Sequence, residues 1–150
     1  MPIPDIFLDT SALFSGIWSA VGGARMLLKL GEARAVNLHV SSQVLTEIEN
    51  VLRHKAPQSL GALALLLDRS QINVVLQISE DQLAIGRSLV SYAPDALVLA
   101  AAWESGLDYF VTLDRKHFLN NQQLHEMAPF KIGTPGDCLT WYRNLYAGMK

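Results

Sequence analysis

Residues 3–13, with the sequence IPDIFLDTSAL, decide the fold class, because a short apolar run ends abruptly in one acidic and two hydroxyl side chains. The β-branched and aromatic residues of this run are typical of a buried strand. Similar runs occur at 36–40, 72–78 and 109–112, with a shorter one at 130–132, and they alternate with segments of helical periodicity. Because the runs are apolar throughout rather than alternating, they predict a three-layer α/β/α architecture. Its parallel sheet of four to five strands has helices on both faces.

Helices are expected between these strands, bounded by Gly, Pro, Ser or Thr residues. The expected ranges are 12–20, 22–30, 41–56, 58–68, 81–90, 95–105 and 135–146, with a short helix from residue 115 and a loop from there to residue 129.

The composition predicts one domain spanning residues 1–150, since 50% of the residues are hydrophobic and only 17% are charged. The formal net charge of −2 argues against nucleic-acid binding by bulk positive charge. The longest charge-free apolar stretches, 60–67 and 96–103, are far shorter than the roughly 18 residues that span a bilayer. Residues 1–5 lack the basic and apolar regions of a signal peptide. We therefore expect a cytoplasmic protein with no membrane association.

Two of the predicted strands end in the same way, with an aspartate beside hydroxyl residues. Asp9 follows the first strand, and Asp114 follows the strand at 109–112. Ligands bind open parallel sheets outside the carboxyl ends of the strands, so both aspartates are expected at the functional edge. The alternative is that each carboxylate only caps a turn or the next helix.

Two further acids are candidates on helices. Asp95 opens an apolar helix, where it also suits a purely structural role in the first turn. Because that helix leads directly into the strand at 109–112, its start is expected to lie some distance from Asp114 along the sheet. Whether Asp95 returns to the carboxyl edge depends on the placement of the helix, which the sequence does not fix. Glu47 and Glu49 flank one apolar helical stripe, but Glu49 has Arg53 four residues later, whereas Glu47 has no local cation. Glu47 is therefore the better candidate for a site.

Four segments resemble, in the same order, the signature segments of PIN-domain proteins. They are LDTSAL at 8–13, TEIENVL at 46–52, PDALVLAAA at 94–102 and FVTLDRKHF at 110–118. The resemblance continues loosely to KIGTPGDCL at 131–139, which suits the last strand and helix of that family. The family includes the ribonuclease toxins of VapBC-type toxin–antitoxin pairs, and its fold implies a sheet with the strand order 3-2-1-4-5. Each segment alone is a weak motif, but four in order on an α/β layout are fairly specific.

The resemblance implies a catalytic, metal-binding acidic quartet, supported by small hydroxyl residues. The quartet would be Asp9, Glu47, Asp95 and Asp114, and the supporting residues would be Ser11 and Thr112. Ligands that offer only oxygen favour Mg²⁺ or Mn²⁺, which would bind a scissile phosphate and lower the pKa of a bound water. The expected function is thus a metal-dependent endoribonuclease, the toxin of a type II toxin–antitoxin pair. Its partners would be an RNA substrate, a cognate antitoxin protein and a second copy of the chain in a homodimer.

Substrate phosphates need cations near this edge. Arg115, Lys116 and His117 come directly after Asp114 and are the best placed, whereas Arg53 and its neighbours, or Arg25 and Lys29, are less well placed. All of these side chains also suit an ordinary solvated surface. Such cations would hold phosphates and carry little information about the base sequence.

Two other functions stay open. One is a PIN-like RNA-binding or protein-binding module without catalysis, and the other is an Asp-based phosphohydrolase built on Asp9. The phosphohydrolase is disfavoured because position 11 is Ser11 rather than a second aspartate. A zinc site is also disfavoured, since the four histidines show no HxxxH spacing and Cys138 is the only cysteine. Residues 60–67 and Trp18 could form a dimer or antitoxin surface, but core packing is the expected use.

Overall fold

The computed structural model describes residues 3–147, so the ends of the domain expected at 1–150 lie outside the described residues. Five parallel strands form one sheet in the order β3-β2-β1-β4-β5, which confirms the predicted topology. The strands are β1 (Asp5–Leu8), β2 (Asn37–Ser41), β3 (Asn73–Val75), β4 (Tyr109–Val111) and β5 (Lys131–Gly133). Because β1 and β4 are neighbours, the segments that follow them leave the sheet side by side at its carboxyl edge.

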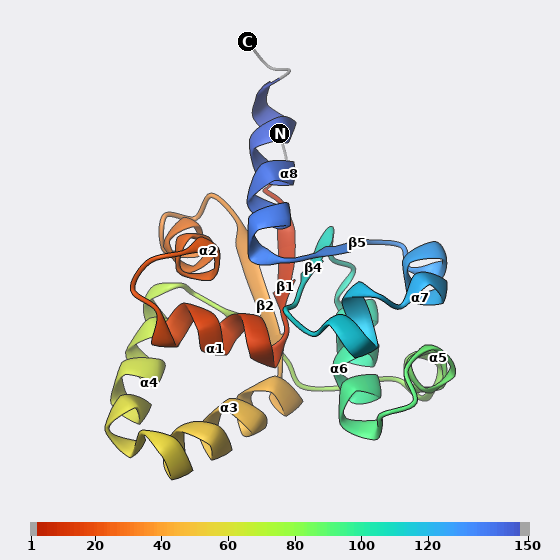
Figure 1. Ribbon diagram of the computed structural model, residues 1–150, viewed down its shortest axis with the longest axis horizontal. Coiled ribbons are helices and arrows are strands. Elements are labelled where there is room, and N and C mark those ends of the chain that lie inside the picture. The colour runs from red at the N-terminus through yellow and green to blue at the C-terminus, as the bar shows by residue number, and fades with distance from the viewer. Residues whose placement is uncertain (1–2, 148–150) are drawn as a thin grey trace.

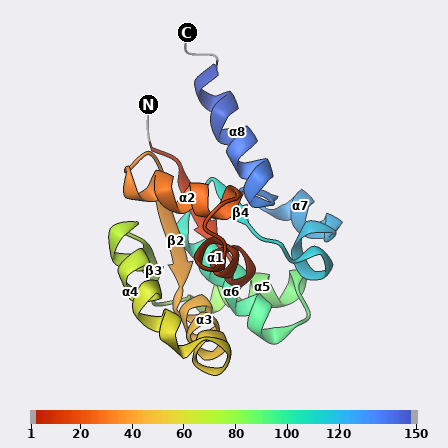
Figure 2. The same cartoon turned by 60° about the vertical axis from the view of Figure 1, so that its left-hand side comes forward.

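Helices cover both faces of the sheet (Figures 1 and 2). They are α1 (Thr10–Trp18), α2 (Gly23–Glu32), α3 (Ser42–Lys55), α4 (Leu60–Arg69), α5 (Glu80–Leu89), α6 (Ala93–Ser105), α7 (Gln122–Met127) and α8 (Pro135–Ala147), with a 3₁₀ turn η1 (Pro57–Ser59) and a π turn η2 (Arg115–Leu119). α1, α2 and α8 pack on one face, and α6 with α5 against it packs on the other. α3 lies beyond the carboxyl ends of the strands, where it contacts both α1 and α6 (Figure 1). Among the described residues, no helix is both long and apolar enough to cross a membrane.

The central strands form the middle of the core, as their unbroken apolar sequence predicts. Ile6, Phe7 and Leu8 of β1 are almost completely buried. On the neighbouring strand β4, Phe110 stacks on Phe7 with ring centroids 5.5 Å apart. A strand covered on both faces has no solvent side, so apolar residues occupy successive positions rather than alternate ones.

The packing of α5 on α6 sets the position of the site. Gly86 of α5 lies so close to the carbonyl oxygen of Ala96 that a Cβ atom at this position would overlap with it. α6 then ends at Gly106, which adopts a left-handed conformation with φ of 67° and redirects the chain into β4. Helix α6 therefore runs antiparallel to the strand that it precedes, and its first turn lies at the carboxyl edge of the sheet.

Two expected elements differ in extent or kind. β3 is shorter than the predicted strand at 72–78, because it is an edge strand that pairs only with β2, and Leu76 beyond it is 75% exposed. The segment expected as a loop before residue 129 contains the short helix α7. Asn121 caps this helix, since its side-chain oxygen accepts a hydrogen bond from the amide of Leu124.

The expected core packing of residues 60–67 and Trp18 is correct for one side of the helix and wrong for the other. Leu63 is buried, and Leu60, Leu66 and Leu67 pack against the core. Leu65 is 49% exposed and Trp18 is 63% exposed. α4 touches the rest of the domain along one side, through α1, α3 and the turn before it. A helix that is apolar nearly all round thus keeps part of its apolar surface in solvent, as does the end of α1 next to it.

Candidate active site

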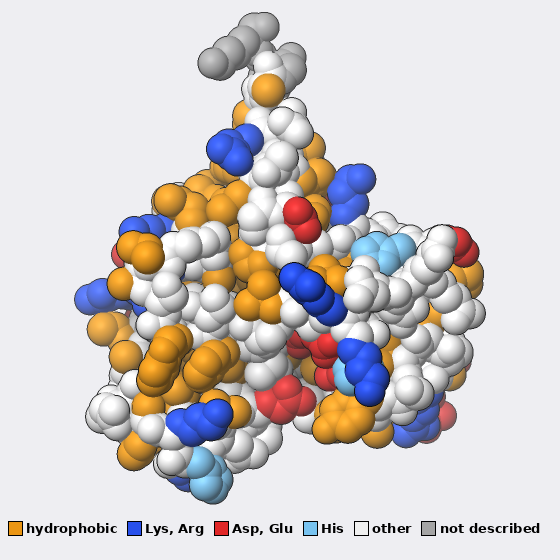
Figure 3. Space-filling model, in the orientation of Figure 1, with side chains coloured by type: hydrophobic (Ala, Val, Ile, Leu, Met, Phe, Trp, Pro, Cys, Tyr) orange, Lys and Arg blue, Asp and Glu red, His pale blue; other side chains and the backbone are white. Residues whose placement is uncertain are grey.

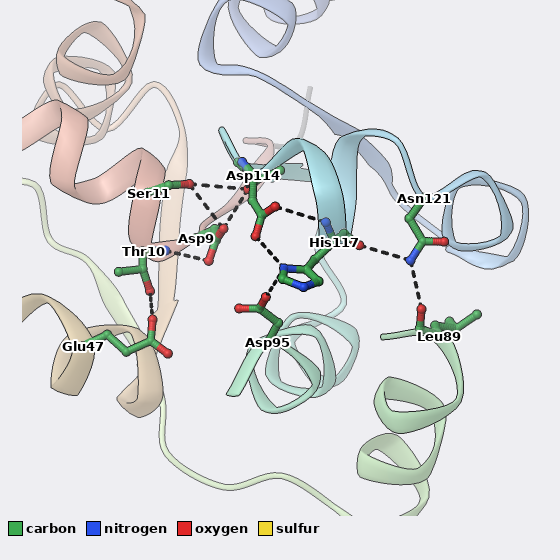
Figure 4. Close-up of polar contacts among 10 residues, drawn as sticks. Asp9, Thr10, Ser11, Glu47, Leu89, Asp95, Asp114, His117 and Asn121 are labelled. Atoms are coloured by element: carbon green, nitrogen blue, oxygen red, sulfur yellow. Dashed lines mark hydrogen bonds and ion pairs between the residues drawn. The ribbon is translucent and has the colours of Figure 1, made fainter. Parts of the chain in front are cut away.

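Four acidic side chains from four separate segments line one pocket at the carboxyl edge of the sheet (Figure 4). Asp9 follows β1 and Asp114 follows β4, while Glu47 projects from α3 and Asp95 from the first turn of α6. The pocket has a volume of about 350 Å³. In the space-filling view, acidic side chains gather in a central hollow, with lysine and arginine side chains around it (Figure 3). The structure thus brings all four predicted acids together.

Asp9 is the best-anchored of these acids and is only 4% exposed. One carboxylate oxygen accepts a hydrogen bond from the amide of Thr10 at 2.7 Å, which makes Asp9 the N-cap of α1. The other oxygen accepts hydrogen bonds from the hydroxyls of Thr112 at 2.7 Å and Ser11 at 3.3 Å. Both predicted supporting residues therefore donate to Asp9. The capping role and the position in the pocket are compatible, since the same carboxylate does both.

Glu47 is held on the opposite wall by neutral donors. The hydroxyl of Thr10 donates to Oε2 at 2.5 Å, and the side-chain amide of Gln43 donates to Oε1 at 3.0 Å. Gln43 lies one helical turn before Glu47, so both side chains are on the face of α3 that looks into the pocket. No cation pairs with Glu47 within residues 3–147. Thr10 thereby links the Asp9 segment to α3.

Asp95 and Asp114 meet at the ring of His117, as Figure 4 shows. Nδ1 of His117 lies 2.7 Å from Oδ2 of Asp95 and 3.0 Å from Oδ2 of Asp114. The backbone amide of His117 also donates to Asp114 at 3.0 Å, which holds the π turn η2 against the end of β4. One ligand atom from each of the three residues lies within 4.8 Å of the other two.

The expected separation of Asp95 from Asp114 is wrong, because the direction of α6 decides it. A helix that leads into a parallel strand must return to the amino end of that strand, so the helix itself begins at the carboxyl edge. Asp95 in its first turn consequently lies on the same ring nitrogen as Asp114, which follows the strand.

Burial makes two of the acids unusually reluctant to ionise. Desolvation raises the pKa of Asp9 from 3.8 to about 6, although its hydrogen bonds with Thr112 and Thr10 act in the opposite direction. Desolvation also raises the pKa of Asp95 from 3.8 to about 6, while the charge of His117 lowers it and the neighbouring carboxylates of Asp114 and Glu47 raise it. Ionising this cluster is unfavourable unless a cation or a proton compensates the charge.

An unsatisfied oxygen in the cluster indicates where a cation fits. Oδ2 of Asp95 is buried, and no hydrogen bond reaches it from any residue between 3 and 147, despite the nearby nitrogen of His117. Nδ1 carries at most one hydrogen and cannot serve Asp95 and Asp114 together, and the aligned contact is the one to Asp114. Carboxylate and hydroxyl oxygens around a buried acid are the donor set of a hard divalent cation. The residues present therefore fit such an ion.

The basic side chains near the pocket are only partly those expected from the sequence. Lys55 lines the pocket, because it follows Glu47 by eight residues and shares its face of α3. Arg53 is on the same helix but does not line the pocket. Arg115 and Lys116 are exposed on η2, whereas the ring of His117 turns inward to the acids. Lys55 was among the less well placed candidates, and counting helical turns from Glu47 is the signal that separates it from Arg53.

Arg25, the other basic candidate on this side of the molecule, has a structural use. Its guanidinium donates to the carbonyl oxygens of Gly16 and Ile17, and so caps the last turn of α1. Lys29 lies one helical turn further along α2, in a separate groove between α2 and α4 that does not include the acids.

The sequence of residues 5–116 matches the family model described as the PIN domain. This chain belongs to the PIN domain family. The matched residues include all four acids of the pocket, together with Ser11 and Thr112.

Two solved structures with the same fold are similar to this PIN domain protein at low sequence identity. One is VapBC2 from Rickettsia felis bound to a DNA fragment from its promoter, at 18% identity and a TM-score of 0.62, covering 87% of this chain and 98% of that one. The other is VapC20 from Mycobacterium tuberculosis, described as a sarcin–ricin loop cleaving toxin. It shows 16% identity and a TM-score of 0.53, and the match covers 75% of this chain and 92% of that one. No curated protein matches the sequence significantly.

Proposed function

We propose that this PIN domain protein is a metal-dependent endoribonuclease. The observation that carries the proposal is the convergence of Asp9, Glu47, Asp95 and Asp114 on one pocket at the carboxyl edge of the sheet. Burial raises the pKa of Asp9 and Asp95, and the neighbouring carboxylates raise it further. Holding buried acids together destabilises the fold unless their charge is compensated, so the arrangement suits a site that binds cations. Family membership and the fold of the two VapC-containing structures support the same reaction class.

Each residue has a role in this proposal. Asp9, Asp95 and Asp114 would hold Mg²⁺ or Mn²⁺ directly or through water, and Glu47 would hold the ion or orient the attacking water. A bound divalent ion supplies positive charge for the scissile phosphate and lowers the pKa of a coordinated water. Ser11 and Thr112 orient Asp9 through their hydroxyls.

The rim of the pocket would hold the RNA. Lys55 at the edge of the pocket is placed to contact a phosphate, and Arg115 and Lys116 on η2 extend the positive charge along the strand. No nucleophilic side chain is needed for this reaction.

We further propose that the protein is the toxin of a type II toxin–antitoxin pair, acting in the cytoplasm as a homodimer. Exposed apolar side chains on α1, α2 and α4 and between α1 and α2 support a protein partner, since large apolar side chains in solvent mark interaction surfaces. They are Trp18, Val21, Met26 and Leu65. VapBC2 from Rickettsia felis, which has the same fold, carries the name of the VapBC-type pairs and is described as bound to a DNA fragment from their promoter.

The nuclease proposal is tested by incubating the purified chain with a mixed RNA pool and Mg²⁺ or Mn²⁺, with and without EDTA. We expect cleavage that EDTA abolishes and that Asp9→Asn loses. Asp68→Asn, which changes an exposed carboxylate on α4, is the matched control and should cleave like the wild type. Cleavage that survives both EDTA and Asp9→Asn would overturn the proposal. RNA binding without cleavage would favour a non-catalytic module, and an acyl phosphate on Asp9 would favour a phosphohydrolase.

The toxin proposal needs a separate measurement in cells. Expression of the chain should arrest growth, and the Asp9→Asn variant should not. Coexpression of a small neighbouring reading frame that encodes a DNA-binding protein should relieve the arrest. Growth that is unaffected by an actively cleaving chain would leave a stand-alone nuclease as the better description.

A further inference from the structure

A second groove lies directly beside the acid pocket, on the far side of His117. It has a volume of about 440 Å³ and is formed by the turn between α5 and α6 together with η2. Its lining includes Ser91, Tyr92, Lys116, His117 and Asn121. His117 lines this groove, and its ring nitrogen contacts Asp95 and Asp114, which line the acid pocket, so the ring connects the two.

The aromatic ring of Tyr92 is presented to solvent in this groove. One face of the ring stacks on His117, with ring centroids 5.4 Å apart and planes 14° from parallel. The residue is nevertheless 54% exposed, although tyrosine is a large and mostly apolar side chain. Because His117 covers one face, the exposed area belongs to the opposite face and the edges of the ring. The face of Tyr92 that is turned away from His117 is therefore a flat aromatic surface open to solvent. Only the ring of His117 separates it from Asp95 and Asp114.

The surroundings of Tyr92 are rigid and carry a free positive charge. The side-chain amide of Asn121 donates to the carbonyl oxygens of Leu89 and His117 and so ties the end of α5 to η2. Lys116 is exposed on the rim, and no carboxylate pairs with it in the part of the chain that the structure describes. The groove thus combines an open aromatic face with a lysine beside a proposed site of phosphodiester cleavage.

We propose that Tyr92 is a stacking platform for an unpaired base of the RNA substrate, next to the bond that is cut. Single-stranded nucleic acids bind where aromatic faces alternate with cations, because every base can stack and every nucleotide brings a phosphate. Lys116 would contact the backbone of the same nucleotide. The proposal rests on the nuclease function, and it adds that the substrate is single-stranded or splayed at this position.

A protein partner suits this groove less well than RNA does. The exposed apolar residues that support a protein partner lie on other elements, away from the groove. Trp18 ends α1, Val21 lies just before α2, Met26 is on α2 and Leu65 is on α4. The apolar residues that line the groove, Leu89 and Val90, are buried, and its other lining residues include the polar and basic Ser91, Lys116 and Asn121.

The proposal is tested by binding rather than by cleavage. A short single-stranded RNA with 2-aminopurine at successive positions is titrated with the full chain carrying Asp9→Asn, in Mg²⁺, so that the RNA stays intact. Stacking quenches 2-aminopurine fluorescence, so we expect quenching at one position. Adding Tyr92→Ala should abolish that quenching and weaken binding about 5- to 150-fold, which is about 1–3 kcal/mol per stacked base at 1.4 kcal/mol per tenfold.

Two further variants separate stacking from other roles of the side chain. Tyr92→Phe keeps the ring and should retain both the quenching and the affinity. Tyr146→Ala removes another partly exposed tyrosine whose ring packs at an angle against an aromatic ring. It lies near the end of α8, away from the carboxyl edge, and the variant should bind like the parent (Figure 1). Lys116→Ala should lower the salt dependence of binding by somewhat less than one unit of slope, as expected for one phosphate contact.

The results that overturn the stacking site differ from those that overturn the nuclease. If Tyr92→Ala binds and quenches like the parent, or if Tyr92→Phe loses both, the stacking site is wrong even where RNA is cleaved. If wild-type chain cleaves nothing, the nuclease proposal fails whatever Tyr92 does. Circular dichroism and thermal unfolding of each variant should match the parent, because the altered ring is on the surface.

Discussion

Replacing Asp9 by asparagine should change the free energy of unfolding in a way that depends on pH. Without divalent ions, the variant should gain stability relative to the wild type as the pH rises from about 4 to about 8. The reason is the buried carboxylate, whose pKa desolvation raises from 3.8 to about 6 in the folded state. A raised pKa means that the folded form binds the proton more tightly than the unfolded form does. Stability from this group is therefore complete below about pH 4 and is lost as the pH rises through about 6.

The size of the effect follows from the shift of about 2 pH units, at 1.36 kcal/mol each. The wild type should lose about 3 kcal/mol of unfolding free energy from this group between about pH 4 and pH 8, and the asparagine variant should not. For a chain of 150 residues this corresponds to roughly 6–12 °C in Tm. Asparagine can still accept the amide hydrogen bond of Thr10, so the cap of α1 is kept.

Urea unfolding followed by circular dichroism in EDTA, at several pH values from about 4 to 8, measures this difference. Asp68→Asn on the exposed side of α4 is the matched control and should follow the wild type at every pH. Adding Mg²⁺ at about pH 8 should reduce the difference in unfolding free energy between Asp9→Asn and the wild type, because a bound cation offsets the buried charge of the wild-type carboxylate. A difference between the two proteins that stays constant across this pH range would refute the argument from desolvation.

Three other substitutions test separate parts of the structure. Lys55→Ala should raise KM for RNA roughly fivefold, which is about 1 kcal/mol, and leave kcat unchanged. Arg53→Ala, on the other face of α3, should leave KM unchanged. Equal effects of the two variants in steady-state assays would contradict the placement of Lys55 at the rim. His117→Ala should lower the unfolding free energy by about 1–3 kcal/mol in EDTA, because the carboxylates of Asp95 and Asp114 lose the group between them. The loss should be smaller in Mg²⁺. If urea unfolding gives the same loss in EDTA and in Mg²⁺, the ring acts by packing alone. Gly86→Ala should lower the stability measured by thermal unfolding by about 1–3 kcal/mol, because its Cβ would overlap a backbone carbonyl of α6. Gly61→Ala, in open space on α4, should instead stabilise the protein by about 0.5–1 kcal/mol. The reverse order of stabilities would disprove the close contact of α5 and α6.

Much of the fold was predictable because it depends on local patterns. The unbroken apolar strands, such as the one ending at Leu8, predict a parallel sheet with both faces covered, and the resemblance to PIN domains implies its order. The edge strand β3 and the helix α7 were less predictable, since pairing on one side only and a single capping residue, Asn121, leave weak signals. For α4 the core packing was predicted correctly on one side only, because a helix that is apolar nearly all round does not show in its sequence which side faces solvent.

The sequence by itself determined the place of Asp9 and Asp114, because the position after a parallel strand is at the carboxyl edge whatever surrounds it. Glu47 and Asp95 were site candidates on helices, and the resemblance to PIN domains implied that they join the other two. Only the tertiary structure decided how those side chains meet. The return of α6 brings Asp95 to Asp114, and the π turn η2 inserts the ring of His117 between them. The open face of Tyr92 beside that ring likewise depends on the packing of α5, α6 and η2. The physical reason is that such contacts join residues distant in the chain, so their geometry is set by packing and by chain direction rather than by local sequence.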